Sequence, residues 1–331
     1  MNVLGIGRLC IDKYYYLRSD VERVKSTKQG IRFAGQRLGG SVPRMLSCLV
    51  NCGHNAMLIG NGSNMLDESH YVLEQLALLG VQNNIAVKEK LPESFLIYDS
   101  GNNLISVLSV EENEHQLLDE YDICIASIST YNPDLVITDI RHGKASLAVT
   151  EWANRNRRHV FLDPGSSLMH KLFSSSRLTD EAQLLKHCSI ICSSEEFYKE
   201  FCNTNDIRSI FNNNLFNNLQ LAICTLSDGT TVVATQDFGF SVTRTRDIRV
   251  CNSLGTGDVY RGFFLNYLLK NIMHSPFEVD ILETAAKLAI AAATIQIEST
   301  KLHCIVPSLK EVEKTLATLP FSRSNTTKFI L

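Results

Sequence analysis

The sequence predicts an α/β fold in which helices cover both faces of a mostly parallel β-sheet. Two patterns support this prediction. Short apolar runs alternate along the chain with segments whose apolar residues recur at helical spacing. Within each run the apolar residues are continuous, which is typical of parallel strands that are buried on both faces. The length of 331 residues is within the range of large α/β domains, which bury a substantial core.

The predicted elements follow one another regularly from the N-terminus. Residues 3–6 form a strand, residues 42–51 a helix, residues 56–59 a strand and residues 67–79 a helix that Gly80 ends. The later predicted strands cover residues 123–126, 135–137, 160–162, 190–192 and 221–224.

Two pairs of segments depart from the pattern of buried strands. Residues 14–17 and 31–33, and likewise residues 95–98 and 104–108, indicate exposed antiparallel strands. Residues 99–103, with the sequence Asp-Ser-Gly-Asn-Asn, predict the turn that joins the second pair.

Composition argues against several classes of function. Hydrophobic residues make up 44% of the chain and charged residues 20%, which is typical of a globular protein in water. The net charge of −3 argues against a general nucleic-acid-binding protein, which usually carries a basic face. No apolar run is long enough to span a membrane, and the N-terminus lacks the basic start and cleavage site of a secretory signal.

The ten cysteines are scattered through apolar segments rather than spaced as a disulfide framework. We therefore expect reduced, buried thiols and a cytoplasmic location. The closest spacing, Cys188-x-x-x-Cys192, lacks nearby paired His or Cys ligands, so a zinc site is not expected.

The strongest chemical signal lies at residues 252–258, Asn-Ser-Leu-Gly-Thr-Gly-Asp, directly before an apolar helical run over residues 259–269. Gly255 and Gly257 allow backbone N–H groups to crowd together at a helix N-terminus, where they attract anionic phosphates. Asp258 lies in the first turn and can accept a proton from a hydroxyl group. An ordinary loop with a capped helix is the alternative interpretation. The Gly-Lys-Ser/Thr ending of a Walker loop is absent.

This segment resembles the C-terminal motif of the ribokinase-like (PfkB) carbohydrate kinases, in which Gly-x-Gly-Asp also precedes an apolar helix. A second match is Gly39-Gly40-Ser41-Val42-Pro43-Arg44 with the helix that follows it, which resembles the Gly-Gly motif of the family. Weaker matches, in the same order as in the family, are residues 5–12, 161–164, 193–196, 225–229 and 306–309. Together they cover nearly the whole chain.

The resemblance implies a three-layer α/β/α fold with a mostly parallel central sheet and a small β lid. Residues 1–331 would form one kinase domain, with lid strands from about 12–36 and 92–112. Some members of the family dimerise through the lid, so a homodimer is a further expectation. The implied reaction is phosphorylation of a hydroxyl group on a small sugar or sugar derivative by ATP with Mg²⁺.

The resemblance also assigns roles to residues of this sequence. Asp258 would be the general base. The anion hole would consist of Gly255, Thr256 and Gly257. The acceptor would be bound by Asp12, Gly39, Gly40, Arg44 and Asp163. The nucleotide would lie against Ser193, Thr225, Ser227, Gly229 and Ile290. Glu196 would help to place magnesium through water.

Several positions depart from the family pattern. Asn residues of the family are replaced by Arg44, Ser193 and Ile290, and a Thr is replaced by Leu254. Asn252 stands where the family has an acid near a monovalent cation, which leaves a requirement for that cation open. If Arg44 points into the pocket, its fork of donors favours an acidic or already phosphorylated sugar. A surface arginine is the alternative.

Two other functions fit the same sequence. A nucleoside or vitamin-precursor kinase would use the same base with a more aromatic acceptor pocket, to which Tyr14 and Tyr15 could contribute. A binding protein that has lost turnover would explain the substitutions at residues 193, 252, 254 and 290. The intact Asp258 argues against this second alternative.

Overall fold

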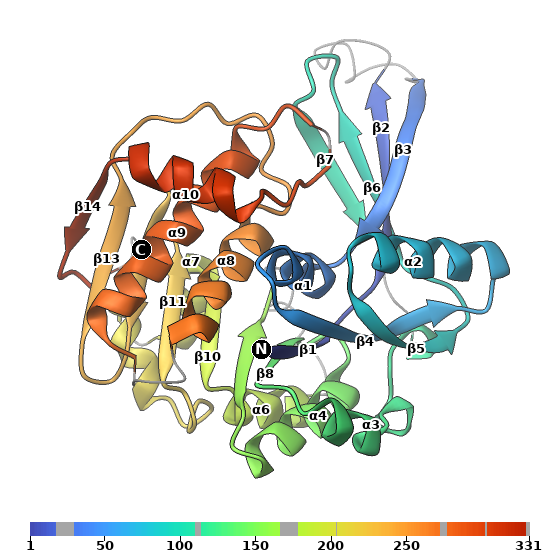
Figure 1. The fold of residues 1–331 in the computed structure, drawn as a ribbon, viewed down its shortest axis with the longest axis horizontal. Helices are drawn as coiled ribbons and strands as arrows, with labels where there is room; N and C mark the ends of the chain where they lie inside the picture. Colours follow the sequence, from blue (N-terminus) through green and yellow to red (C-terminus); the bar gives the residue numbers. More distant parts are fainter. Residues whose placement is uncertain are drawn as a thin grey trace.

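The computed structural model describes residues 1–17, 30–109, 114–165, 178–202, 204–271, 277–301 and 303–328, with two β-sheets (Figure 1). The larger sheet has ten strands in the order β14-β13-β12-β11-β10-β9-β8-β1-β4-β5. Its strands are β1 (Asn2–Ile6), β4 (Asn55–Ser63), β5 (Gln82–Lys88), β8 (Leu135–Asp139), β9 (His159–Asp163), β10 (Ile190–Ser194), β11 (Leu221–Thr225), β12 (Thr230–Ala234), β13 (Gly239–Arg244) and β14 (Phe321–Ser324).

The strands from β5 to β11 pair in parallel, and only β12, β13 and β14 add antiparallel pairs at one edge. The predicted mostly parallel sheet is therefore confirmed. Its central strands are apolar on both faces, as in β8, where every residue is buried. Because these strands run in the same direction, the polar residues that end them gather at the carboxyl end of the sheet.

Helices cover both faces of the large sheet, which confirms the three-layer α/β/α prediction (Figure 1). One apolar cluster joins the sheet to α1 (Ser41–Asn51), α2 (Leu66–Leu78), α8 (Thr256–Asn271), α9 (Val279–Ile297) and α10 (Leu309–Thr318). The second cluster lies on the opposite face, against α3 (Ile125–Tyr131), α4 (Gly143–Arg155), α6 (Leu178–His187) and α7 (Glu195–Phe201). No helix within the described ranges is long and apolar enough to cross a membrane.

The smaller sheet has four strands in the order β3-β2-β6-β7 and projects away from the large sheet (Figure 1). Its strands are β2 (Cys10–Leu17), β3 (Ile31–Gly39), β6 (Glu93–Tyr98) and β7 (Leu104–Ser109). The two predicted antiparallel pairs are confirmed, and parallel pairing of β2 with β6 joins them. In the turn before β7, the Asp99 carboxylate accepts backbone N–H bonds from Gly101 and Asn103.

The alternation along these strands gives the small sheet two different faces. Tyr14 pairs with Leu96, and Leu96 with Val107, so these side chains share one face. Tyr14, Leu96 and Tyr98 form a small buried cluster there. The neighbouring side chains Tyr15 and Phe33 lie on the other face, which is considered below.

One predicted strand is wrong. Residues 123–126 do not form a strand, because α3 begins at Ile125, and the side chains of Cys124 and Ile125 are exposed. Of the apolar residues in this region, Ile128 is the one that is buried in the helix. A short apolar run fits one face of a short helix as well as a strand, so periodicity alone does not distinguish them.

Candidate active site

The turn before α8 has a backbone conformation that requires glycine. Gly255 has φ +68°, and a Cβ atom at this position would lie 2.5 Å from the Sγ of Cys304. Two amide side chains fix the same turn. Asn252 accepts a hydrogen bond from the backbone N–H of Leu254 at 2.9 Å, and Gln296 donates to the Leu254 carbonyl at 2.8 Å. The turn is thus held by α9 and cannot widen freely.

The N-terminus of α8 is suited to bind an anion. The first N–H groups of any helix have no intrahelical acceptor, and α8 begins at Thr256, within the predicted Gly255-Thr256-Gly257 anion hole. The buried hydroxyl of Thr256 also has no hydrogen-bond partner among the described residues. The backbone N–H of Thr256 itself donates to the Ser253 carbonyl oxygen at 3.3 Å. An unpaired buried hydroxyl at a helix N-terminus favours a ligand with strong acceptor oxygens, such as a phosphate group.

Asp258 lies in the first turn of α8 and is only 6% exposed. Its Oδ1 accepts a hydrogen bond from the hydroxyl of Ser41 and lies 3.5 Å from Nη1 of Arg261. Its Oδ2 lies 3.3 Å from Nη1 of Arg44. The carboxylate is therefore oriented from both sides, by α1 and by its own helix, which is the kind of fixed geometry that a general base requires.

Arg44 points into the site, so the alternative of a surface arginine is excluded. Its side chain is 16% exposed and joins Asp258 to Asp12, whose Oδ2 pairs with Nη2. Burial opposes the charge of the guanidinium, but Asp12 and Asp258 more than offset it and raise the pKa of Arg44 above its ordinary value. The predicted acceptor residue Asp12 and the predicted base are thus linked through one cation.

The predicted glycines Gly39 and Gly40 lie where larger residues do not fit. A Cβ on Gly39 would lie 2.5 Å from Oδ1 of Asp12. Gly40 has φ +113°, and a Cβ there would lie 2.1 Å from the carbonyl oxygen of Arg8. Both glycines therefore bring the chain close to Asp12 and to the start of α1.

These residues border a cavity of about 200 Å³. The large sheet contributes Asp163, and α1 with the residue before it contributes Gly40, Ser41 and Arg44. The small sheet contributes Asp12, Ser94, Leu96 and Val107. Arg8, Asp139 and Arg141 also line the cavity. The structure therefore gathers most of the predicted acceptor-binding residues around one partly open cavity beside Asp258, and the small sheet forms part of its wall.

Asp139 was not among the predicted site residues, although a signal for it was present. It ends β8 as Asp163 ends β9, and the two residues pair in register. Burial raises the pKa of Asp139 to about 6, and nearby Asp163 adds to the rise, although backbone N–H groups of Arg8 and Arg141 donate to the carboxylate at 3.1 Å each. A polar residue at the end of a predicted buried strand is the same signal that identified Asp163.

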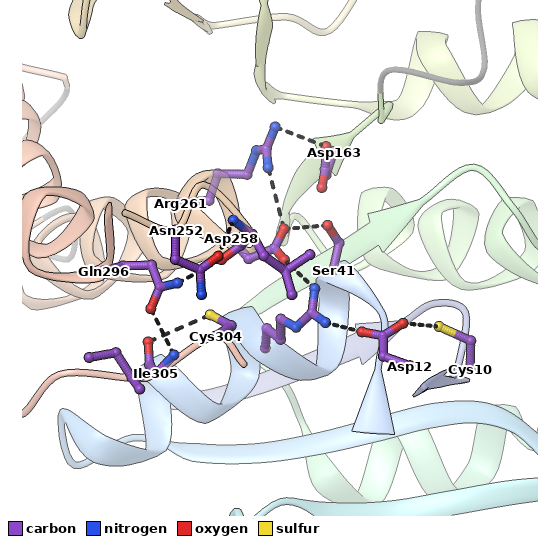
Figure 2. A network of polar contacts seen from close by, with 12 residues as sticks. Cys10, Asp12, Ser41, Asp163, Asn252, Asp258, Arg261, Gln296, Cys304 and Ile305 are labelled. Carbon is purple, nitrogen blue, oxygen red and sulfur yellow. Dashed lines mark hydrogen bonds and ion pairs between the residues drawn. The ribbon is translucent and has the colours of Figure 1, made fainter. Parts of the chain in front are cut away.

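Arg261 was also missed. It lies one helical turn after Asp258, and its Nη2 is 3.3 Å from Oδ1 of Asp163 (Figure 2). The spacing of three residues from the predicted base on a predicted helix could have indicated it.

Four of the five predicted nucleotide residues lie at or just beyond the carboxyl ends of β10 and β11, and β10 is the neighbour of β9 in the sheet. Ser193 is buried near the end of β10, and Thr225, which ends β11, donates to its carbonyl oxygen at 3.4 Å. Ser227 and Gly229 follow in the turn between β11 and β12, where Gly229 has φ +85°. The predicted nucleotide loop is therefore a neighbour of β9, which carries Asp163.

The last two predicted ligand contacts, Ile290 and Glu196, lie in different environments. Ile290 is 3% exposed and belongs to the larger apolar cluster, so its role as a nucleotide contact is not retained. Its apolar side chain packs in the core, where the family has a polar residue. Glu196 is exposed in the first turn of α7, and a hydrogen bond from Ser194 lowers the pKa of its carboxyl.

The arrangement of layers and site defines the class of structure: the chain has the ribokinase-like fold. It is similar to a carbohydrate kinase from Agrobacterium tumefaciens, with 16% identity, a TM-score of 0.74, and coverage of 98% of this chain and 99% of that chain. It is similar to ribokinase from Giardia lamblia, with 15% identity, a TM-score of 0.76, and coverage of 96% and 98%. No protein-family model matches the sequence, and no curated protein matches it either.

A third similar structure is a protein described as a ribokinase II from E. coli, solved in complex with ATP and Mg²⁺. It shares 13% identity with this chain, with a TM-score of 0.76 and coverage of 96% of this chain and 99% of that chain. In the present structure the unpaired Thr256 hydroxyl and the amides that begin α8 fit a phosphate chain. Within the described ranges no group of three or more His, Cys, Asp or Glu residues is placed to hold a metal ion.

Proposed function

We propose that the protein is an ATP-dependent kinase that phosphorylates a hydroxyl group on a small sugar or sugar derivative. The observation that carries this proposal is the position of Asp258. The carboxylate lies beside the open N-terminus of α8 and next to residues that line a cavity with carboxylate and guanidinium groups. A base and an anion-binding site on one short segment are what transfer of a phosphoryl group to a hydroxyl requires.

The residues of this chain would have the following roles in the reaction. Asp258 accepts the proton of the acceptor hydroxyl as the oxygen attacks the γ-phosphorus. The amides of Gly255, Thr256 and Gly257 stabilise the charge on the transferred group. Asp12, Gly39, Gly40 and Asp163 position the acceptor, since each carboxylate can accept hydroxyl hydrogens. The small sheet closes over the acceptor as a lid and excludes water, so that ATP is not simply hydrolysed.

The nucleotide would lie against Ser193, Thr225, Ser227 and Gly229. When bound, Mg²⁺ would neutralise charge on the phosphates. Glu196 would contact this hydration shell. Asn252 donates to the Lys301 carbonyl at 2.6 Å and accepts from Leu254, so its neutral amide holds the turn where the family has an acid.

An acidic or phosphorylated sugar is the subclass of acceptor that we favour. Three arginines, Arg8, Arg44 and Arg141, line the cavity together with three aspartates, Asp12, Asp139 and Asp163. Guanidinium groups bind carboxylates and phosphates through paired donors. An Arg44→Asn variant should lose its preference for anionic acceptors over neutral sugars by roughly tenfold or more in kcat/KM. Unchanged selectivity would show that Arg44 serves only to join Asp12 and Asp258.

The two alternatives make different predictions. A nucleoside or vitamin-precursor kinase would need an aromatic surface in the cavity, but Tyr14 packs in the small-sheet cluster and Tyr15 lies on the opposite face. A binding protein without turnover would bind nucleotide and transfer no phosphate. We also propose that residues 1–331 act as one domain in a cytoplasm, where all ten cysteines remain free thiols, as they are in the structure.

The test is ATP- and magnesium-dependent ADP release with a panel of sugars, sugar acids, phosphosugars and nucleosides. One acceptor class should support turnover, and Asp258→Asn should lower kcat by about 10³-fold or more while ATP still binds. ATP binding without turnover on any acceptor would favour the binding protein. Turnover that survives Asp258→Asn would exclude Asp258 as the base.

A further inference from the structure

The side chain of Arg261 lies at the meeting point of three parts of the site. It is 13% exposed and contacts Asp258 at 3.5 Å and Asp163 at 3.3 Å. Its Nε also donates to the carbonyl oxygen of Cys192 at 3.3 Å. Asp163 belongs to the acceptor cavity, whereas Cys192 precedes Ser193 on β10, the strand of the predicted nucleotide site. Arg261 therefore connects the two halves between which a phosphoryl group would pass.

The guanidinium also lies against the proposed anion hole. A Cβ atom on Gly257 would lie 2.9 Å from Nη1 of Arg261, so the cation packs directly over the backbone of that turn. A phosphate oxygen bound by the first amides of α8 would therefore lie close to this positive charge. A preorganised cation at such a place stabilises charge that is spread over the transferred group.

A purely structural role leaves part of this arrangement unexplained. Two carboxylates already compensate the buried charge, and Asp258 is also held by Arg44 and Ser41. A buried ion pair of this kind often adds little net stability compared with apolar residues of similar size. The position of the cation over the Gly257 backbone has a direct use if an anion binds there.

We propose that Arg261 is a catalytic residue that contacts the transferred phosphoryl group and, in the absence of nucleotide, orients Asp258. This inference rests on the kinase function proposed above. In the step, the acceptor O–H bond breaks and its proton passes to Asp258, while the acceptor oxygen forms a bond to the γ-phosphorus. The bond from that phosphorus to the bridging oxygen breaks, and ADP leaves with the electron pair. Arg261 transfers no proton and remains a cation throughout.

Steady-state kinetics with the best acceptor form the first test. Arg261→Met should lower kcat by about 10²- to 10³-fold, with changes in the KM values for ATP and acceptor of less than about threefold. Arg261→Lys keeps the charge without the fork of donors, so its kcat should lie between those of the wild type and Arg261→Met. Arg246→Ala is the matched control, since Arg246 is an exposed arginine paired with Glu298 at 2.8 Å, and its kcat should stay within about twofold of the wild type.

Chemical rescue distinguishes a phosphoryl contact from a structural one. Added guanidinium ions at millimolar concentration should raise the kcat of Arg261→Ala at least fivefold and leave the wild type and Arg246→Ala unchanged. A variant that is merely misfolded is not rescued by a small cation. Absence of rescue, together with kcat losses that follow the loss of melting temperature across the variants, would overturn the proposal.

A binding experiment tests Arg261 without turnover. MgADP with aluminium fluoride imitates the charge of the phosphoryl group in transfer, and calorimetry should show that Arg261→Met weakens its binding at least tenfold relative to MgADP alone. Equal weakening of both ligands, or of neither, contradicts the inference. If the wild type turns over and Arg261→Met does so equally well, only the inference fails. If the wild type binds neither ADP nor its fluoride complex, the proposed function fails with it.

Discussion

Charged side chains alternate in sign around the candidate active site. Asp12, Arg44 and Asp258 form one series, and Asp258, Arg261 and Asp163 continue it, so that each buried charge has at least one neighbour of opposite sign. Burying a charge without such a partner costs several kcal/mol, which makes single substitutions in this series informative about stability as well as activity. Asp139 has a different environment.

The carboxylate of Asp139 is stabilised by backbone N–H groups, while its burial and the neighbouring Asp163 favour the protonated form, so that its pKa is about 6 instead of 3.8. A carboxyl group whose pKa is raised by folding destabilises the folded state once the pH exceeds the unfolded pKa. The cost grows between about pH 4 and pH 6 and is then constant, at ~3 kcal/mol for a shift of about two units.

We therefore expect Asp139→Asn to remove this pH-dependent cost. Relative to the wild type, the variant should gain about 1–3 kcal/mol more at pH 7.5 than at pH 4, because only at the higher pH is the wild-type carboxylate ionised. Urea unfolding at both pH values measures the difference. A stability difference between variant and wild type that is the same at both values would contradict a raised pKa for Asp139.

At the scale of single residues, the sequence identified those whose role follows from a local motif. Asp258, Gly255, Gly39 and Gly40 lie in such motifs, and the structure explains each glycine by a close contact or a positive φ. The partners of Asp258 could not be predicted in this way, because Ser41 and Arg44 lie more than two hundred residues away in sequence. Only the packing of α1 against α8 brings them together.

Among the elements, the turn that begins α8 is held more tightly than a surface loop. Gln296 on α9 donates to the Leu254 carbonyl and accepts from the backbone N–H of Ile305, each at 2.8 Å. This amide is fully buried and ties the turn to the segment that carries Cys304 (Figure 2). The position of the proposed anion hole thus depends on residues from α9 and from the segment after it.

This packing predicts a difference between two Gly→Ala variants. Gly255 and Gly53 both have positive φ, but a Cβ would meet Cys304 at Gly255 and nothing within 4 Å at Gly53. Gly53→Ala should cost about 1 kcal/mol for the left-handed backbone alone. Gly255→Ala should cost about 1–3 kcal/mol more, because the turn must move, and it should lower kcat as well.

Denaturant unfolding of both variants measures these costs, and a Gly255→Ala/Cys304→Ala double variant tests the contact. Removal of the Cys304 sulfur should return part of the stability that Gly255→Ala loses. Equal costs for Gly255→Ala and Gly53→Ala would show that the turn yields easily and is not a rigid part of the site.

Strands could be predicted where the sequence has a continuous apolar run. Continuous apolar runs such as residues 135–137 and 160–162 became the buried strands β8 and β9. Residues 123–126 gave a similar signal, but α3 begins within them. The prediction failed because the side chains of a short apolar run do not reveal whether one face or two faces are buried. The parallel pairing of β2 with β6 depends on residues far apart in sequence and was not foreseen.

On the scale of the whole molecule, the small sheet combines two surfaces. One face borders the cavity through Ser94, Leu96 and Val107. The other face, which we call the outer face, carries mostly apolar side chains, and register places Leu17, Ile31, Tyr15, Phe33, Phe95, Ile97 and Leu108 on it. Among them Ile31, Phe33 and Leu108 are 49%, 54% and 56% exposed, so a sizeable apolar surface faces the solvent in the described part of the chain.

We expect a second copy of the chain to cover the outer face. A twofold interface places the same patch on both subunits, so the patch must be complementary to itself. An apolar face meets this condition. The charges that border it do not oppose it either, because Lys13 pairs with Glu93 at 2.9 Å within one copy. In such a dimer each small sheet would be supported by the other, and the wall of each cavity would become more rigid.

Analytical ultracentrifugation at micromolar concentration should therefore show a dimer, and Phe33→Glu should convert it to a monomer, because a charge would be buried without a partner at the centre of the interface. Leu78→Glu is the matched control. Leu78 is 73% exposed on α2, which is not part of the small sheet, and its substitution should leave the dimer intact. Since the small sheet contributes to the cavity wall, the Phe33→Glu monomer should also have a raised KM for the acceptor with little change in ATP binding. A wild-type monomer, or a dimer that persists in Phe33→Glu, would show that the outer face has another partner or none.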